Sequence, residues 1–292
     1  MNADALFGLA LEQVDHQSLG PYRLLETLGE GGLGVVWRAE QLEPVRRHVA
    51  LKLIRPGLQI RRDVIARFEQ ERRTLARMQH PNVAAIYDAG SSPDGRPYFV
   101  MELVEGSTLT DYCWTKGLDL RARLQLFATI CDAVQHAHQK GILHRDLKPS
   151  NIMISVMPGG YLHVKLLDFG LAKYATGPSM QTADEIGNIS GSVHTMAPEQ
   201  LMKEPIDQRT DLYALGCVFY FAATGVMPFE GPTLSDIIQN HLQHQVEPFA
   251  NLRPDLNAHW TNWVMQLIAF HPEDRPQSAA LARTALDGFA KG

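Results

Sequence analysis

Apolar residues in the first third of the chain fall into short runs separated by stretches that contain glycine or proline. Runs of this length that are rich in Val, Leu and Ile are typical of β-strands. The pattern predicts a meander of antiparallel strands, with runs at residues 24–25, 35–37, 48–54, 84–87 and 98–103. One helix is predicted among them at residues 63–78, where apolar positions recur at helical spacing.

After Gly106 the pattern becomes mainly helical. A helix is predicted over residues 121–140 and ends at Gly141; its apolar stripe consists of Leu124, Phe127, Ile130, Val134 and Ala137. Residues 212–229 carry no charge and reach the length at which a membrane span becomes possible. Two glycines and a proline within them, and Asp211 directly before them, argue against a span.

Composition limits the classes of function. The chain has 292 residues, 45% of them hydrophobic and 20% charged, which suits a globular protein of one two-lobed unit or two small domains. Its net charge is −5 and its basic clusters are short, which argues against nucleic acid as a partner.

Cysteine usage and the N-terminus bear on the compartment. Cys113, Cys131 and Cys217 form no Cys-x-x-Cys pair, which argues against a disulfide framework and a zinc site. Residues 1–10 have no basic residue ahead of their apolar run, so they do not resemble a secretory signal. We therefore expect a reducing, cytoplasmic environment.

Two polar motifs indicate the chemistry. The sequence HRDLKPSN occupies residues 144–151, and DFG occupies residues 168–170. Phosphoryl transfer needs a carboxylate near the attacking hydroxyl, oxygen ligands for Mg²⁺ and a cation on the phosphate. Asp146, Asn151, Asp168 and Lys148 supply that set at fixed offsets.

A glycine-rich stretch, Gly29-x-Gly31-x-x-Gly34-x-Val36, would let backbone N–H groups approach phosphates. Alone, this motif suits a dinucleotide-binding fold equally well. A dinucleotide fingerprint runs from a strand into a helix, whereas here the chain continues as a strand after the glycines. The sequence VALK at residues 49–52 follows, which favours a kinase-type loop.

Together these motifs resemble the eukaryotic-type (Hanks-type) Ser/Thr protein kinases, in particular their bacterial subgroup. The resemblance runs from Tyr22 to Arg275 and slightly beyond. It implies an α+β, two-lobed protein kinase fold, with an antiparallel sheet and one regulatory helix in the N-lobe and a mainly helical C-lobe. We expect one kinase domain at residues 21–285, with an extension at 1–20, the N-lobe and hinge at 21–104 and the C-lobe at 105–292.

The implied activity is transfer of the γ-phosphoryl group of Mg-ATP to Ser or Thr hydroxyls of protein substrates. Two alternatives stay open: a pseudokinase that acts as a scaffold, and a small-molecule phosphotransferase. The resemblance also suggests a transient homodimer for autophosphorylation. The chain would be cytoplasmic, as a separate enzyme or as the cytosolic kinase domain of a longer or membrane-associated protein, with no membrane span in this chain and no nucleic-acid partner.

The resemblance assigns catalytic roles residue by residue. Asp146 is the catalytic carboxylate and Lys148 lies beside the transferred phosphoryl group, which favours Ser or Thr as the acceptor. Lys52 contacts the α- and β-phosphates and is held by Glu71, with Glu69 as the competing candidate. Asn151 and Asp168 are the Mg²⁺ ligands.

The nucleotide site is carried over in the same way. Its expected residues are Leu28, Gly29, Gly31, Gly34, Val36, Ala50, Lys52, Met101, Glu102, Val104 and Met153. Scaffold roles are also implied. His144 would pack in a column with Leu75, Ile86 and Phe169 and take no part as an acid or base.

Two further scaffold contacts follow from the family pattern: Glu199 should pair with Arg275, and Asp211 should hold the backbone of the catalytic loop. The stretch GSVHTMAPE at residues 191–199 departs from that pattern at two positions. Ser192 stands where Thr is common but keeps a hydroxyl able to bridge Asp146 and Lys148. Thr195 stands where a bulky residue is expected, so the acceptor-docking surface is atypical.

Arg145 next to Asp146 motivates a regulatory hypothesis, in which a phosphate on the activation loop pairs with this arginine. The candidate sites, in order, are Thr182, Ser190, Thr176 and Ser179. In the alternative, Asp184 and Glu185 already supply the negative charge and no modification is needed.

Overall fold

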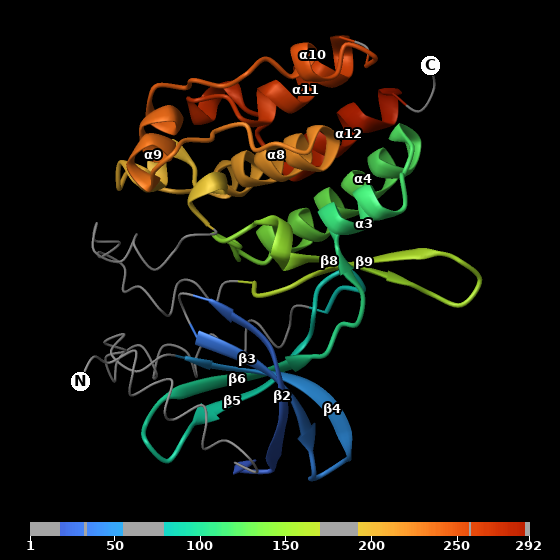
Figure 1. Cartoon of the computed structure of the whole chain (residues 1–292), viewed down its shortest axis with the longest axis vertical. Coiled ribbons are helices and arrows are strands. Elements are labelled where there is room, and N and C mark those ends of the chain that lie inside the picture. The colour runs from blue at the N-terminus through green and yellow to red at the C-terminus, as the bar shows by residue number, and fades with distance from the viewer. Residues whose placement is uncertain (1–17, 32–33, 55–78, 170–191, 257, 290–292) are drawn as a thin grey trace. The chain divides into compact units, whose positions relative to one another are not determined.

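A computed structural model of the chain describes residues 18–31, 34–54, 79–169, 192–256 and 258–289 (Figure 1). These residues form two compact units. The first holds residues 18–31, 34–54 and 85–103, and the second holds residues 79–84 and the described residues from 104 onward. The predicted helix at 63–78, with Glu69 and Glu71, lies outside the described residues, as do the candidate phosphorylation sites.

The first unit is an antiparallel sheet in the order β1-β2-β3-β4-β6-β5. Its strands are β1 (Ser18–Leu19), β2 (Tyr22–Gly31), β3 (Gly34–Gln41), β4 (Arg47–Ile54), β5 (Ile86–Ser91) and β6 (Pro97–Glu102). The predicted meander is therefore confirmed. The run predicted at 84–87 was placed too early, because the backbone N–H of Ala84 bonds to Leu166 outside this sheet and that of Ala85 bonds to the Glu102 carboxylate.

The core of this unit forms around β4, which lies between β3 and β6. Val49 and Leu51 are fully buried, as are Ala39 on β3 and Val100 on β6. Residues 49–54 are all buried, so the side chains on both faces of β4 are covered. An interior strand is the most constrained position in a sheet, so the side chains on β4 are held firmly.

The second unit combines a three-stranded sheet, β7-β8-β9, with helices. The strands are β7 (Ser107–Thr108), β8 (Ile152–Val156) and β9 (Leu162–Leu166). The helices are α3 (Leu109–Thr115), α4 (Leu120–Gln139), α7 (Pro198–Leu201), α8 (Gln208–Thr224), α9 (Leu234–Leu242), α10 (Phe249–Leu252), α11 (Ala258–Leu267) and α12 (Ala279–Phe289). Short 3-10 turns lie at Pro149–Asn151, Val193–Thr195 and Pro272–Asp274.

Helix α8 is the buried central helix of this unit. All but a few of its side chains are buried, and it ends at Gly225, whose φ of 84° is the left-handed conformation that glycine adopts readily. Phe127 of α4 stacks on Phe219 of α8 with ring centroids 4.0 Å apart. Among the described helices, none combines the length and apolar character needed to cross a membrane.

Helix α4 leads into the polar loop at residues 144–151. Asp119 caps it by accepting a hydrogen bond from the N–H of Ala122, and Gly141, with φ 72°, follows its end as predicted. Ile130, Val134 and Ala137 of the predicted stripe are fully buried. This packing fixes the start of the polar loop that follows.

Candidate active site

Asp146, Lys148 and Ser192 form a closed polar triangle in the second unit. The Ser192 hydroxyl donates to Oδ1 of Asp146 at 2.6 Å, and Lys148 Nζ donates to the Ser192 oxygen at 3.1 Å. Lys148 Nζ also lies 3.1 Å from Oδ2 of Asp146. The bridging role predicted for Ser192 is thus confirmed. The triangle holds a carboxylate and an ammonium group in fixed orientation, both partly open to solvent.

Asn151 supports the same carboxylate from the other side of the loop. Its Nδ2 donates to the backbone oxygen of Asp146 at 2.7 Å and lies 3.3 Å from Oδ2. The side chain is buried on the turn before β8. Because the amide nitrogen is engaged, the side-chain oxygen is the atom that a cation would bind.

Asp168 is brought close to Asn151 through the backbone. The N–H of Leu167 donates to the oxygen of Asn151 at 2.9 Å, which places the next residue, Asp168, beside the turn. Asp168 has φ 59°, an unusual conformation for a residue other than glycine. Asn151 and Asp168 offer hard oxygen donors, the ligand type that suits Mg²⁺.

Asp211 fixes the backbone of the loop at residues 144–151 through hydrogen bonds. Its Oδ1 accepts the N–H of Arg145 and its Oδ2 accepts the N–H of His144, both at 2.8 Å, so the predicted role is confirmed. Nε2 of His138 lies 2.8 Å from the same carboxylate. Burial alone would raise the pKa of Asp211, but the hydrogen bond and charge of His138 hold that pKa below its usual value. Arg145 itself has φ 66°, which these bonds stabilise.

His144 is a structural residue in this loop. Its ring is fully buried, 4.4 Å between centroids from Phe169, as the predicted column requires. Nε2 donates to the oxygen of Leu167 at 2.8 Å, while Nδ1 accepts the N–H of Asp146 at 3.3 Å. Burial lowers the pKa of His144, which favours the neutral ring that these two bonds need. Ile86 lies in the other unit and Leu75 outside the described residues.

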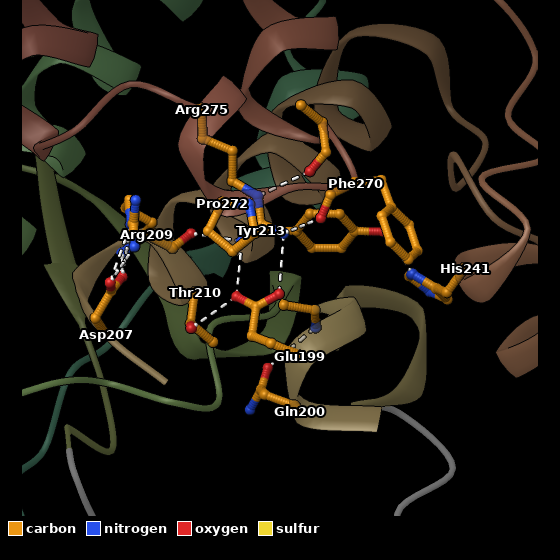
Figure 2. A network of polar contacts seen from close by, with 12 residues as sticks. Glu199, Gln200, Asp207, Arg209, Thr210, Tyr213, His241, Phe270, Pro272 and Arg275 are labelled. Carbon is orange, nitrogen blue, oxygen red and sulfur yellow. Dashed lines mark hydrogen bonds and ion pairs between the residues drawn. The ribbon is translucent and has the colours of Figure 1, made fainter. Parts of the chain in front are cut away.

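A second polar network, shown in Figure 2, anchors the segment after Ser192. Arg275 donates to both oxygens of Glu199, at 2.7 and 2.9 Å, which confirms the predicted pair. Burial would raise the pKa of Glu199, but Arg275 and the hydroxyl of Thr210 keep that pKa below its usual value. Arg275 also donates to backbone oxygens, including that of Phe270 at 2.8 Å. All the charge of this pair is therefore compensated by hydrogen bonds.

The first unit contains Lys52, which was expected to contact the phosphates of the nucleotide, and part of the expected base site. Lys52 lies on β4, with Val36 and Phe99 as its cross-strand partners, and is only 7% exposed. Lys52 is therefore buried and does not point into solvent. Ala50 pairs with Met101, so these two candidates for the base site are direct neighbours.

The glycine motif forms a β2–β3 hairpin, in which Gly29 pairs with Val36 and Gly31 with Gly34. The chain runs from strand to strand and not into a helix, which excludes the dinucleotide fingerprint. A Cβ on Gly34 would lie 2.1 Å from the backbone oxygen of Leu53, so this position requires glycine. Leu28 is half exposed on the same hairpin.

The remaining nucleotide candidates lie in both units. Glu102 ends β6, and its backbone N–H bonds to the oxygen of Ala85. Val104 and Met153 belong to the second unit, where Met153 lies on β8 opposite Thr108. Sequence reasoning missed His138, since nothing in the pattern of α4 distinguishes this histidine from its neighbours.

Comparison with known proteins identifies the class. The protein kinase domain family matches residues 22–285. The chain is 36% identical over 267 residues to the serine/threonine-protein kinase Pkn1 of Myxococcus xanthus, a match that covers 91% of this chain and 38% of Pkn1. It is also 36% identical over 269 residues to PknB of Mycobacterium tuberculosis, covering 91% of this chain and 42% of PknB. The chain thus spans about two fifths of the length of these curated relatives.

The fold is similar to a crystal structure of the Mycobacterium tuberculosis PknI kinase domain, with a TM-score of 0.71, 24% identity, and coverage of 94% of this chain and 98% of that chain. The chain belongs to the protein kinase domain family, among the bacterial Hanks-type Ser/Thr kinases. The predicted family and the protein kinase fold are confirmed.

Proposed function

We propose that this domain transfers the γ-phosphoryl group of Mg-ATP to Ser and Thr hydroxyls of protein substrates. The observation that carries the proposal is the Asp146–Lys148–Ser192 triangle, backed by Asn151. In it, Asp146 orients the acceptor hydroxyl and accepts its proton as the oxygen attacks phosphorus. Lys148, beside that carboxylate, stabilises negative charge on the transferred group.

The residues present fit a divalent cation. Asn151 and Asp168 would hold Mg²⁺, which neutralises charge on the phosphate oxygens when it is bound. Their placement through the Leu167–Asn151 hydrogen bond supports this assignment. His144 does not accept the proton of the acceptor hydroxyl, because both of its ring nitrogens form hydrogen bonds within the loop.

The residues that we assign to the nucleotide fall in each unit, and each set is argued within its own unit. Lys52 would contact the α- and β-phosphates with Glu71 as its ion-pair partner, and the backbone at Gly29, Gly31 and Gly34 would approach the phosphates. The base would be bounded by apolar side chains and would bond to the backbone after β6; these residues are Leu28, Val36, Ala50, Met101, Glu102, Val104 and Met153. The burial of Lys52 and the pairing of Ala50 with Met101 support this assignment.

The domain would span residues 21–285, with its lobes at 21–104 and 105–292. We expect protein substrates, a cytoplasmic location and autophosphorylation on Thr182, Ser190, Thr176 or Ser179 through a transient homodimer. Treatment with phosphatase and a Thr182→Ala change test the regulatory part: if neither alters activity, the loop needs no phosphate.

Phosphate incorporation from labelled ATP tests the proposed activity. The wild type is compared with Asp146→Asn, with Mg²⁺ present and with a chelator, using the protein itself and a generic basic protein as acceptors. The activity should fall by ~10²–10⁴-fold in the variant. Equal thermal unfolding and equal binding of a nucleotide analogue show that the variant is folded. A wild type that binds nucleotide but incorporates nothing would instead support a pseudokinase.

A further inference from the structure

Helix α9 is short and depends on two buried side chains. It has nine residues, of which Ile237 and His241 are buried. A helix of this length is not stable on its own in water, so α9 is held in place by its packing on the rest of the second unit. His241 is fully buried, and an ionisable side chain in the interior needs partners for its polar atoms. The contacts of His241 therefore decide how firmly α9 is attached.

The ring of His241 joins three parts of the second unit. Its Nδ1 lies 2.7 Å from the hydroxyl of Tyr213 on α8, and Figure 2 shows the two side chains next to each other. The ring centroid lies 4.2 Å from that of Phe229, which follows α8. The backbone of Val193 approaches the same ring, whose Nε2 has no hydrogen-bond partner of normal geometry among the described residues. Because Val193 directly follows Ser192, His241 connects α9 to the active-site triangle.

The surroundings of His241 suit a neutral ring. The other titratable or charged side chains on the neighbouring elements are Tyr213 and Cys217 of α8, Glu199 of α7, Glu230 after Phe229, Asp236 of α9, His194 of the turn at Val193–Thr195, His244 and Arg275. The three carboxylates already accept hydrogen bonds, Glu199 from Arg275 and the other two from backbone N–H groups. The guanidinium of Arg275 lies 4.8 Å from the ring centre of Tyr213. A proton on His241 would therefore meet basic neighbours and carboxylates that are already engaged.

These surroundings make the attachment of α9 depend on pH. Burial, together with the nearby His194 and His244, lowers the pKa of His241 to about 3. A histidine released into water has a pKa of ~6.5, so detachment of α9 lets His241 take up a proton in mildly acidic solution. The docked state is fully favoured above about pH 6.5, and this advantage is lost progressively as the pH falls toward 3.

We infer that His241 is a positioning residue for the reaction: its neutral ring holds α9 against Tyr213 and against the turn that follows Ser192, and a proton on it releases both. For catalysis the inference rests on the proposed function, in which Ser192 orients Asp146 and Lys148. The docking of α9 itself does not depend on kinase activity.

Amide hydrogen exchange tests the docking without an assay of activity. After correction for the intrinsic exchange rate, the protection of α9 and of the turn at Val193–Thr195 should fall ~8-fold between pH 7 and pH 5.5, the factor for one histidine that is neutral when docked and has an ordinary pKa when released. Both segments should exchange faster than the buried helix α4 at either pH, because they open locally. Equal protection of α9 and α4 would show that the opening is global and would overturn the inference.

A variant that does not titrate isolates His241. In His241→Asn the side-chain amide reaches the position of Nδ1, so the bond to Tyr213 is kept and the titration is lost. The fall in the protection of α9 between the two pH values should be ~8-fold smaller than in the wild type. The matched control is His259→Asn, at an exposed histidine of α11, which should keep the wild-type fall. A wild-type fall in His241→Asn would contradict the inference.

A double variant guards against loss of packing in His241→Asn. His241→Phe with Tyr213→Phe keeps a ring at each position and removes both polar partners, a replacement that costs little stability. Helix α9 should stay docked in this variant, again without the ~8-fold factor. A double variant that keeps the wild-type pH dependence would show that another group is responsible.

Steady-state kinetics test the effect on catalysis. His241→Ala removes the ring and should lower kcat ~3–10-fold with little change in the KM for ATP, because the segment that carries Ser192 is held less firmly. The double variant should recover most of this loss. An unchanged kcat in His241→Ala would overturn the catalytic part of the inference. A wild type that shows the pH-dependent exchange but phosphorylates nothing would instead overturn the proposed function and leave the docking of α9 standing.

Discussion

The hydroxyl of Ser192 is the part of the active-site triangle that can be removed with the least disturbance. A Ser192→Ala change deletes one oxygen that donates to Asp146 at 2.6 Å and accepts from Lys148 at 3.1 Å. Asp146 and Lys148 would then keep only their direct contact at 3.1 Å and their bonds to the rest of the loop. We expect looser positioning of both groups with the fold intact.

The magnitude follows from the two bonds. Hydrogen bonds to charged groups contribute ~1.5–3 kcal/mol each. Solvent reaches both partners, since the side chains of Asp146 and Lys148 are 12% and 23% exposed, and water can replace part of the lost contact. A net loss of ~1–2 kcal/mol is expected, which corresponds to a ~5–30-fold fall in kcat. Ser192→Thr keeps the hydroxyl and adds one methyl group, so it serves as the matched control.

Initial rates of peptide phosphorylation at several ATP and peptide concentrations separate the effects. The Ala variant should lose kcat while the KM for ATP stays near the wild-type value, because the Ser192 hydroxyl contacts Asp146 and Lys148, which are assigned to the acceptor and the transferred group and not to the base or the α- and β-phosphates. The Thr variant should retain at least half of the wild-type kcat. An Ala variant as active as the wild type, or equal losses in both variants, would show that the hydroxyl does not position Asp146 and Lys148.

Two further substitutions test the scaffold. Gly34→Ala would place a Cβ 2.1 Å from the backbone oxygen of Leu53, so it should lower the stability of the nucleotide-free protein by ~1–3 kcal/mol. At Gly31 a Cβ would meet no heavy atom within 4 Å, so Gly31→Ala should change the Tm little. Equal Tm values for the two variants would contradict this expectation. Glu199→Gln removes the charge from a buried pair with Arg275 and should cost ~3–5 kcal/mol near neutral pH. The folded-state pKa of Glu199 lies below the usual value of 4.5, so its contribution to stability is present above pH 4.5 and is lost as the pH falls through the folded-state pKa. The difference in unfolding free energy between wild type and variant, measured in urea, should therefore narrow on acidification; a constant difference would argue against the ion pair.

Local pattern was enough for much of the fold. The strands β2, β3, β4 and β6 and the helix α4 follow from hydrophobic spacing and a glycine stop, which act within a few residues of chain. The start of β5 could not be predicted, because the N–H groups of Ala84 and Ala85 are taken by Leu166 and Glu102, far away in sequence. The hairpin of β8 and β9 was also not predicted, although residues Leu162–Leu166 of β9 alternate between apolar and polar side chains.

The candidate site shows a similar division. HRDLKPSN gathers Asp146, Lys148 and Asn151 within one loop, so their proximity is contained in the sequence. The contact of His138 with Asp211 joins positions 73 residues apart and carries no local signal. Such pairs depend on how α4 packs against α8, which only the folded chain determines.

The position of Ser192 relative to Asp146 can be traced to the first turn of α8. Thr210 donates to Glu199 at 2.8 Å, and the adjacent Asp211 accepts the backbone of His144 and Arg145. Consecutive residues of one helix therefore hold the segment that follows Ser192 and the loop that contains Asp146. Because α8 is buried along nearly its whole length, these two attachment points cannot move independently. The active-site triangle is thus positioned by the helix beneath it as much as by its own three side chains.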